Sequence, residues 1–290
     1  MFEVLSNEAI APNLHRMVVR APRVAAARKP GQFVIVRRAE GDERIALTIA
    51  DGDAQAGTIT LVIQAIGAST KQIVAVPGGG ALRDVAGPLG MPTHIAQWGR
   101  VACIGGGVGT AVLYPLAKAL AEGGNEVTAI IGARSKPYVI LVDELAAFSA
   151  HVLVTTEDGS MGRKGFVTAE LKEMIDDPQR RPQAVFAVGP VVMMKAVADL
   201  TRPYGIETIV SLNPIMIDGT GMCGGCRVQV GGKTKFACVD GPEFDAHTVD
   251  FDSLVDRLTM YRQHERRIAE ALDHACKIIP ASPAGQADKT

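Results

Sequence analysis

The sequence lacks an excess of either charge and lacks any long apolar segment. It has 30 Lys and Arg against 31 Asp and Glu, for a net charge of −1. Because no basic block is present to neutralise phosphates, binding to DNA or RNA has no electrostatic support. Its apolar runs are far shorter than the ~20 residues that a membrane-spanning helix requires. We therefore expect neither a nucleic-acid partner nor a membrane span.

Cysteine is also scarce, and its distribution is uneven. Of five cysteines, three fall within residues 223–238, whereas Cys103 and Cys276 stand apart and are expected to be packed thiols. Residues 1–6 lack the basic region followed by an apolar core that marks a signal peptide. Clustered cysteines without such a peptide favour a metal site in a reducing cytosol over disulfides. We expect a cytoplasmic protein.

The cysteine-rich segment has the spacing D-x4-C-x2-C-x11-C, formed by Asp218, Cys223, Cys226 and Cys238. Plant-type [2Fe–2S] sites read C-x4-C-x2-C, so a carboxylate here replaces the first thiolate. Thiolates suit iron–sulfur chemistry, and a carboxylate can supply the fourth bond to a ferric iron. Glycines, which suit a loop wrapped closely round a cluster, occupy positions 219, 221, 224 and 225. The pattern predicts a [2Fe–2S] cluster.

Zinc is the alternative metal, because it also accepts three thiolates and an oxygen. Structural zinc sites usually have two CxxC pairs, or one CxxC with HxxxH, and neither is present. No His lies between residues 211 and 242. The ligand pattern therefore favours the cluster over zinc, and over cysteines that are simply buried.

Residues 1–98 predict a small antiparallel β-barrel. Strand patterns separated by turns recur regularly, with little helix expected before Ser69. The expected strands are residues 15–20, 32–37, 46–50 and 58–64.

Residues 99–210 change to alternating strands and helices. Continuous apolar runs are typical of strands buried on both faces, and the alternation predicts a doubly wound parallel sheet, an α/β domain. The expected strands are residues 101–104, 126–131, 152–155 and 184–188, with a helix at 108–122.

The last two segments are the cluster loop, residues 211–250, and a helical tail, residues 251–290. A charged helix is expected from residue 253 to about residue 277. We interpret its charges as a solvated face, with a partner-docking surface as the alternative.

Two turns indicate a nicotinamide nucleotide site. Gly105, Gly107 and Gly109 stand between a strand and a helix, where bare backbone and helix amides suit a pyrophosphate. The strict GxGxxG pattern fails because Thr110 takes the place of its third glycine. Gly189 and Pro190 follow the strand at 184–188. Both turns come at the carboxyl ends of parallel strands, and we expect them to line one crevice.

The barrel segment contains weaker signals for a flavin. Arg44 and Thr48 stand on one expected strand, where a guanidinium suits a diphosphate and a hydroxyl suits a ring atom. A turn with hydroxyls and free amides, formed by Gly67, Ser69 and Thr70, suits the same diphosphate. Each signal alone is common on protein surfaces.

In combination, these features resemble the ferredoxin-reductase-type flavoproteins that carry a C-terminal [2Fe–2S] loop. The electron-transfer subunit of dihydroorotate dehydrogenase is one such protein. The chain is most similar to the small (alpha) subunit of NADH-dependent ferredoxin:NADP oxidoreductase, also named sulfide dehydrogenase subunit beta. The stretches that carry the resemblance are residues 218–223, 238–245 and 257–261.

The resemblance implies a role for each matching residue. Arg44, Leu47 and Thr48 match the FAD strand; Gly67, Ser69 and Thr70 match the diphosphate turn; Gly105, Gly107 and Gly109 match the nucleotide turn; Asp218, Cys223, Cys226 and Cys238 match the cluster ligands. Two positions depart from the family pattern. Ala46 stands where relatives tend to have Pro or an aromatic residue, and Val188 replaces the Cys of a Cys-Gly-Pro turn.

The resemblance also implies a mechanism and a partner. NAD(H) exchanges a hydride with FAD, whose electrons pass singly through the cluster to a large subunit carrying flavin and [4Fe–4S] centres. That subunit resembles the small subunit of glutamate synthase and leads indirectly to ferredoxin. In relatives the assembly couples NADH, NADPH and ferredoxin by electron bifurcation. The cofactors do the chemistry, so no catalytic side chain is assigned.

The choice of nucleotide stays open. Arg134 and Lys136 follow the second expected strand of the α/β segment, where basic residues favour the 2′-phosphate of NADP(H). The resemblance favours NAD(H) instead, with Asp143 or Glu144 as candidates to bind a ribose. Two alternatives to the whole interpretation also remain: an electron-transfer subunit of dihydroorotate dehydrogenase, and a zinc-bound module without catalytic function.

Overall fold

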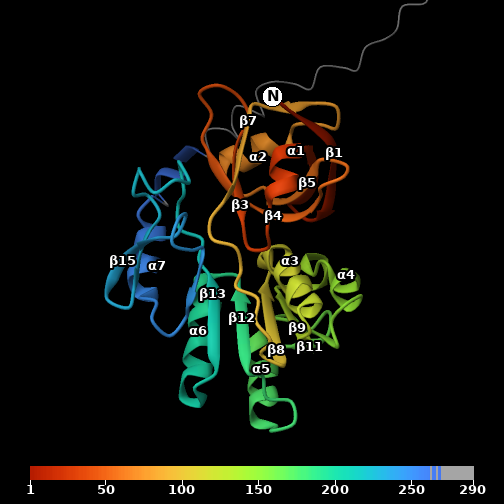
Figure 1. Cartoon of the computed structure of the whole chain (residues 1–290), viewed down its shortest axis with the longest axis vertical. Helices are drawn as coiled ribbons and strands as arrows, with labels where there is room; N and C mark the ends of the chain where they lie inside the picture. The colour runs from red at the N-terminus through yellow and green to blue at the C-terminus, as the bar shows by residue number, and fades with distance from the viewer. Residues whose placement is uncertain (262, 266, 269–290) are drawn as a thin grey trace, which may run out of the picture.

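The computed structural model describes residues 1–261, 263–265, 267 and 268. Its first unit is a nearly closed antiparallel sheet (Figure 1), as the strand spacing predicted. The strands follow the order β6-β1-β2-β5-β4-β3-β7. Their bounds are β1 Phe2–Ala11, β2 Leu14–Arg20, β3 Phe33–Arg37, β4 Ile45–Asp53, β5 Thr58–Gln64, β6 Ala81–Leu82 and β7 Asp84–Leu89.

Alternating side chains of these strands fill the barrel. Along β5 every second residue is buried, with Ile59, Leu61 and Ile63 pointing inward. This is expected of a strand that has one face toward the core and one toward solvent. Two short helices cover the barrel, α1 Pro22–Ala27 and α2 Ala68–Val74. The first is a short helix within the segment where the sequence predicted little helix. Pro begins its first turn, where no backbone donor is lost.

The second unit is a mainly parallel sheet with strand order β11-β10-β9-β8-β12-β13-β16. All neighbouring pairs are parallel except β13 with β16, which adds an antiparallel edge. The doubly wound sheet was therefore predicted correctly. Its strands are β8 Arg100–Gly106, β9 Glu126–Ala133, β10 His151–Thr156, β11 Arg163–Lys164, β12 Ala184–Val188, β13 Glu207–Ser211 and β16 Glu243–Asp245.

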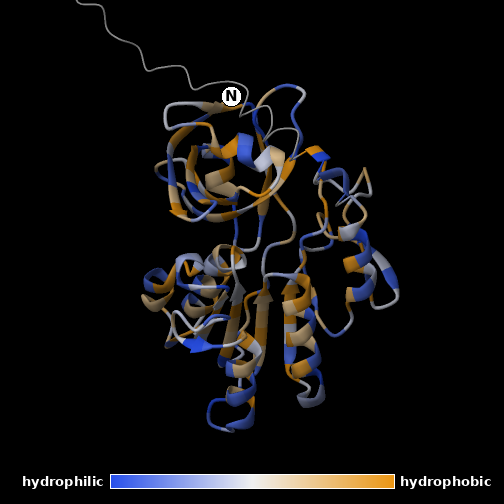
Figure 2. Cartoon of the chain, turned by 180° about the vertical axis from the view of Figure 1, so that it is seen from behind, coloured by the Kyte–Doolittle hydropathy of each residue, from blue (hydrophilic) through white to orange (hydrophobic). Residues whose placement is uncertain are grey.

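Helices cover both faces of this sheet. Those on one face pack around Leu113, Leu116 and Leu145, and those on the other around Leu171 and Met194. Figure 2 shows the strands as a mostly hydrophobic layer between helices of mixed character. The helices are α3 Gly109–Glu122, η1 Lys136–Tyr138, α4 Val142–Ala146, α5 Val167–Asp176, α6 Val191–Thr201 and η2 Arg202–Tyr204.

The cysteine-rich segment does not stand alone. Its hairpin, β14 Arg227–Val230 with β15 Lys233–Phe236, is followed by β16, which joins the parallel sheet, and by helix α7 Phe251–Thr259. Cys226 and Cys238 belong to the same apolar core as Phe33 of the barrel. The loop is therefore held between the other two units.

The predicted helical tail is described only in part. Helix α7 begins at Phe251 and ends at Thr259, and the segment 269–290, with Cys276, lies outside the described residues. Among the described helices, none has the length and apolar content needed to cross a membrane.

Candidate functional site

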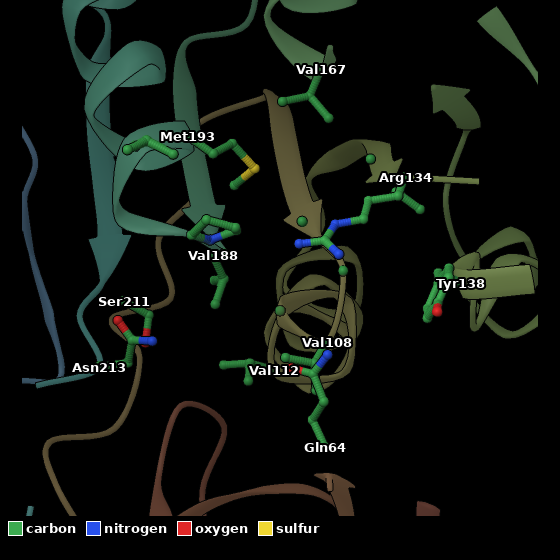
Figure 3. Close-up of a pocket in the computed structure, with 18 of the residues that line it drawn as sticks. Gln64, Val108, Val112, Arg134, Tyr138, Val167, Val188, Met193, Ser211 and Asn213 are labelled. Carbon is green, nitrogen blue, oxygen red and sulfur yellow. The ribbon is translucent and has the colours of Figure 1, made fainter. Parts of the chain in front are cut away.

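A crevice of about 1120 Å³ lies where the barrel meets the carboxyl edge of the parallel sheet. Figure 3 shows Gln64 on the barrel side, Val108 just before α3 and Val112 on it, and Ser211 at the end of β13 with Asn213 after it. This volume slightly exceeds that of a typical pocket for one small ligand. The crevice is large enough for parts of two ligands.

Four of the predicted nucleotide residues line this crevice together, namely Gly107, Gly109, Gly189 and Pro190. Space at Gly109 is very tight, because an added Cβ would lie 2.4 Å from the carbonyl oxygen of Val188. Gly107 instead has open space around it and a φ of +56°. The two glycine turns therefore pack against each other and leave backbone facing the crevice.

Gly105 lies behind this wall. It is not among the residues that line the crevice, and an added Cβ there would lie 2.9 Å from the Cα of Thr110. Its lack of a side chain allows close packing between β8 and α3, and its contact with a nucleotide stays a prediction.

Strand β4 divides its side chains between the crevice and the barrel core. Ala46 and Thr48 line the crevice, whereas Ile45 and Leu47 pack against the core of the barrel. Successive residues of a strand face opposite sides, so Leu47 can meet a flavin only through its backbone. The expected place of Leu47 on the FAD strand stays a prediction, with its backbone as the part that faces the crevice side.

Arg44 does not line the crevice either. Its Nε donates a hydrogen bond of 2.8 Å to the carbonyl oxygen of Ile217, at the start of the cysteine-rich loop. The guanidinium that was predicted to hold a diphosphate joins the barrel to the predicted cluster loop in this structure through its Nε.

The predicted diphosphate turn also lies outside the crevice lining. Thr70 closes the start of α2, where its Oγ1 accepts a 3.1 Å hydrogen bond from the Gly67 amide. The Ser69 hydroxyl donates to the carboxylate of Glu43. In this structure the hydroxyls thus bind neighbouring protein groups.

The crevice also contains Arg134, which the sequence marked as a candidate for a 2′-phosphate, and two residues that the sequence did not mark, Tyr138 and Glu157. Arg134 follows β9 and points into the crevice in Figure 3, with Tyr138 at its edge. Glu157 follows β10 and also lines the crevice. The predicted ribose ligand Glu144 forms a 2.9 Å ion pair with Arg16 instead. A rule based on strand ends would have selected Glu157, because it directly follows a buried parallel strand.

The cysteine-rich loop places its four candidate ligands near one another. The Asp218 carboxylate accepts hydrogen bonds from the amides of Thr220 (2.8 Å) and Cys223 (2.7 Å). These amides, Thr220 first, lower the pKa of Asp218. The sulfur atoms of Cys226 and Cys238 lie 3.1 Å apart in the interior. Burial, then the contact with Cys226, raises the pKa of Cys238 to about 12.

Two features of this loop fit an iron–sulfur cluster. Amides already point at sulfur, with Gly225 N 3.4 Å from Cys223 Sγ and Cys238 N 3.5 Å from Cys226 Sγ. Buried thiols with raised pKa need a cation to be held as thiolates. Within the described ranges, no three His, Cys, Asp or Glu side chains converge as ligands of one ion. A [2Fe–2S] cluster divides four ligands between two irons.

The fold and the two sites define an electron-transfer oxidoreductase with a ferredoxin-reductase fold. An Amycolatopsis cytochrome P450 reductase shares the fold, with a TM-score of 0.60 at 20% identity over 71% of this chain and 66% of that one. The model of the iron-sulfur cluster binding domain of dihydroorotate dehydrogenase B matches residues 213–250, and the oxidoreductase NAD-binding domain matches 103–199.

Full-length relatives define the family. The dihydroorotate dehydrogenase B electron transfer subunit homolog of Thermotoga maritima is 46% identical, covering 91% of this chain and 93% of its own length. The corresponding subunit of Fusobacterium nucleatum is 31% identical, covering 86% and 97%. The chain belongs to the family of dihydroorotate dehydrogenase B electron transfer subunits.

One solved structure is similar over nearly the whole chain. The NADH-dependent reduced ferredoxin-NADP oxidoreductase structure aligns with a TM-score of 0.88 at 44% identity, covering 94% of this chain and 98% of that one. The resemblance found in the sequence is thus confirmed. The protein is an electron-transfer flavoprotein subunit whose cofactors are FAD, an iron–sulfur cluster and a nicotinamide nucleotide, and which serves a partner catalytic subunit.

Proposed function

We propose that this chain is the electron-transfer subunit of an NADH-linked ferredoxin:NADP oxidoreductase. Its proposed partner is a large subunit with flavin and [4Fe–4S] centres, similar to the glutamate synthase small subunit, through which ferredoxin is reached indirectly. The 44% identity over 94% of the chain with the oxidoreductase structure, against 31% with the dihydroorotate dehydrogenase B subunit of Fusobacterium nucleatum, supports this choice over a dihydroorotate dehydrogenase partner. Bifurcating electron transfer, the activity associated with that structure, is part of the proposal.

The observation that carries the proposal is the packing of the loop of Asp218 directly on the barrel. At Gly219 an added Cβ would lie 2.6 Å from Leu89 Cδ1 and 3.1 Å from Ile35 Cγ1. The loop therefore has no spare space between itself and the barrel. We assign a [2Fe–2S] cluster to this loop, held by Asp218, Cys223, Cys226 and Cys238. When bound, the flavin and the cluster supply the conversion between hydride chemistry and single-electron transfer.

The remaining residue assignments belong to the crevice. We assign the flavin ring to the barrel side, beside Thr48, and the nucleotide to Gly107, Gly109, Gly189 and Pro190. Residues 1–98, 99–210, 211–250 and 251–290 are the corresponding functional units: FAD barrel, nucleotide domain, cluster loop and helical tail.

NAD(H) is the nucleotide we assign. The crevice contains the carboxylate of Glu157 after β10, and a carboxylate in a nucleotide crevice binds the ribose hydroxyl of NAD and repels a 2′-phosphate. Arg134 in the same crevice is then available to the pyrophosphate. Rates of flavin bleaching with NADH and with NADPH test this choice, and a faster reaction with NADPH would overturn it.

Exposed apolar side chains around the cysteine-rich loop support a partner at this end of the molecule. Met222 is 89% exposed, and neighbouring apolar residues add to the same region. Apolar side chains gathered in one region commonly mark a protein interface. The other exposed apolar residues of the segment 211–250 are Ile215, Ile217 and Val239.

Purification of the chain with its operon neighbours, followed by NADH-linked ferredoxin reduction, tests the function. We expect flavin bands, a broad [2Fe–2S] absorption and ferredoxin reduction that requires the large subunit. A complex that instead oxidises dihydroorotate would favour the second partner. A colourless, zinc-containing protein would overturn the proposal in both forms.

A further inference from the structure

Glu243 is an acidic residue in an enclosed position outside the predicted sites. It begins β16 and pairs with Ser211 at the carboxyl end of β13. The hydroxyl of Thr93 donates a 2.7 Å hydrogen bond to its Oε1. Thr93 is only 7% exposed and belongs to the linker that joins β7 of the barrel to β8 of the sheet. The carboxylate thus joins the linker to the segment that follows the cysteines.

The barrel meets the same carboxylate. The amide of Thr93 donates a 2.9 Å hydrogen bond to the carbonyl oxygen of Pro30. At Gly31, with φ of +81°, an added Cβ would lie 2.4 Å from Thr93 Oγ1 and 2.8 Å from Glu243 Oε1. The barrel, the linker and the segment that follows the cysteines therefore meet at the hydrogen bond between Thr93 and Glu243. There is no room there for a side chain at Gly31.

The residues beside this hydrogen bond form part of the crevice wall. Phe33 and Pro242 both line the crevice. Gly90 lies between them, where an added Cβ would be 2.9 Å from Phe33 Cε1 and 3.1 Å from Pro242 Cδ. The Met91 amide donates a 2.7 Å hydrogen bond to the carbonyl oxygen of Gly241. A shift of the linker would move this wall relative to the cysteine-rich loop.

We propose that Glu243 is a positioning residue, which through Thr93 holds the linker and so sets the spacing between the flavin crevice and the cluster loop. The inference rests on the proposed assignment of FAD and the cluster to these two places. Electron transfer between two centres depends steeply on their separation, so the chain's contribution is to keep that separation small and constant.

The chemistry of the carboxyl group agrees with this role. Burial raises the pKa of Glu243 to about 7, against the opposing effect of the Thr93 hydrogen bond. Its ionisable neighbours are Cys103 on β8, whose thiol pKa is raised by burial and then by Glu243, and Asp245 on the same strand. A group that positions through its acceptor oxygen is replaceable by glutamine, which keeps that oxygen.

The fluorescence of the chain's single tryptophan, Trp98, reports on the position of the linker in protein that carries no cofactor. Trp98 packs edge-on against Phe186 with ring centroids 5.4 Å apart, and its Nε1 donates to Glu207. In the cofactor-free full chain, we expect Glu243→Ala to shift Trp98 emission towards that of an exposed indole and Glu243→Gln to leave it unchanged. Equal emission from wild type and the alanine variant would overturn the inference.

The second measurement uses the full chain with FAD and the cluster bound. Rapid mixing with NADH gives a flavin-bleaching phase and a cluster-reduction phase. We expect Glu243→Ala to slow the second phase about tenfold or more, the scale of ångström misplacement, with the first phase unchanged and glutamine restoring the rate. Equal second-phase rates in wild type and alanine variant would overturn the inference. If wild type itself shows neither phase, the proposed function fails instead.

If the Glu243→Ala chain does not fold, a matched pair of substitutions at Thr93 tests the same inference. Thr93→Val removes the hydroxyl at nearly constant shape, and Thr93→Ser keeps it. Slow cluster reduction in the valine variant alone supports the inference. Similar rates in both variants would contradict it.

Discussion

The guanidinium of Arg44 and the carbonyl oxygen of Ile217 are joined by a 2.8 Å hydrogen bond, although the two residues are 173 positions apart. This bond connects the residue directly before strand β4 of the barrel to the first turn of the cysteine-rich loop. It gives Arg44 a role in holding the loop, where the sequence pattern had predicted a role in holding a diphosphate.

Removal of the Arg44 side chain should lower the iron content if Arg44 holds the loop, and the flavin content if it holds a diphosphate. Arg44→Ala should lower the iron content of the purified chain and leave its flavin content unchanged, because the lost hydrogen bond contributes about 1 kcal/mol at an exposed position. Iron and flavin are measured on the same sample, with Arg44→Lys as the control that keeps the charge. Loss of flavin with iron retained would support the diphosphate role instead.

Asp218 carries the least usual ligand assignment, and two substitutions test it. Asp218→Cys should keep the cluster and shift its reduction potential, since thiolate and carboxylate donate differently to iron. Asp218→Ala should leave one iron open and make the cluster labile. Redox titration followed by visible absorption checks both. An alanine variant with wild-type spectrum and potential would exclude Asp218 as a ligand.

Gly107 and Gly109 should respond differently to alanine. At Gly109 the added Cβ would meet the Val188 carbonyl oxygen at 2.4 Å, so Gly109→Ala should lower the free energy of unfolding by about 1–3 kcal/mol. Gly107→Ala meets no atom within 4 Å and should cost about 1 kcal/mol through its positive φ.

The affinity for NADH is a second property that tests Gly107→Ala. The Cβ of Gly107→Ala would reduce backbone access to the pyrophosphate, and we expect about tenfold weaker NADH binding, equal to about 1.4 kcal/mol. Thermal melting and NADH titration measure the two effects. Wild-type NADH affinity in a folded Gly107→Ala chain would remove this turn from the nucleotide site.

Glu243 should make stability depend on pH. Its pKa rises from 4.5 to about 7 on folding, so between those values the folded chain holds a proton that the unfolded chain releases. The stability that Glu243 contributes is therefore fully present below about pH 4.5 and is lost as the pH rises through about 7. The loss amounts to about 3 kcal/mol.

Comparison with Glu243→Gln isolates this dependence from that of other groups. The difference in unfolding free energy between variant and wild type should change by about 3 kcal/mol in favour of glutamine from pH 4.5 to 8. Chemical denaturation at several pH values measures it. A difference that stays constant with pH would show that Glu243 titrates normally.

Much of the fold was predictable because local patterns and the global fold agree. The apolar run at 184–188 coincides with β12 Ala184–Val188, and the strand predicted at 58–64 coincides with β5 Thr58–Gln64. The first run is buried along its whole length, and the second buries every other residue, as their apolar patterns indicate. The six-residue helix α1 was missed because one and a half turns are too short for a periodic pattern to stand out.

The site was less predictable, since it depends on contacts between distant segments. The sequence put Arg44 and Leu47 on one strand but did not reveal that Arg44 turns to Ile217 or that Leu47 faces the barrel core. Likewise, nothing local to Ser69 indicates that its hydroxyl meets Glu43. The four ligand candidates were predictable because their spacing lies within one short segment, so that little tertiary information is required.

The central claim is that Asp218 and the three cysteines of the loop hold a [2Fe–2S] cluster beside a flavin. Iron, acid-labile sulfide and flavin, assayed per chain on anaerobically prepared protein, test it most directly. We predict about two irons and two sulfides for each FAD. Flavin-containing protein without iron, or with one zinc in its place, would contradict the account.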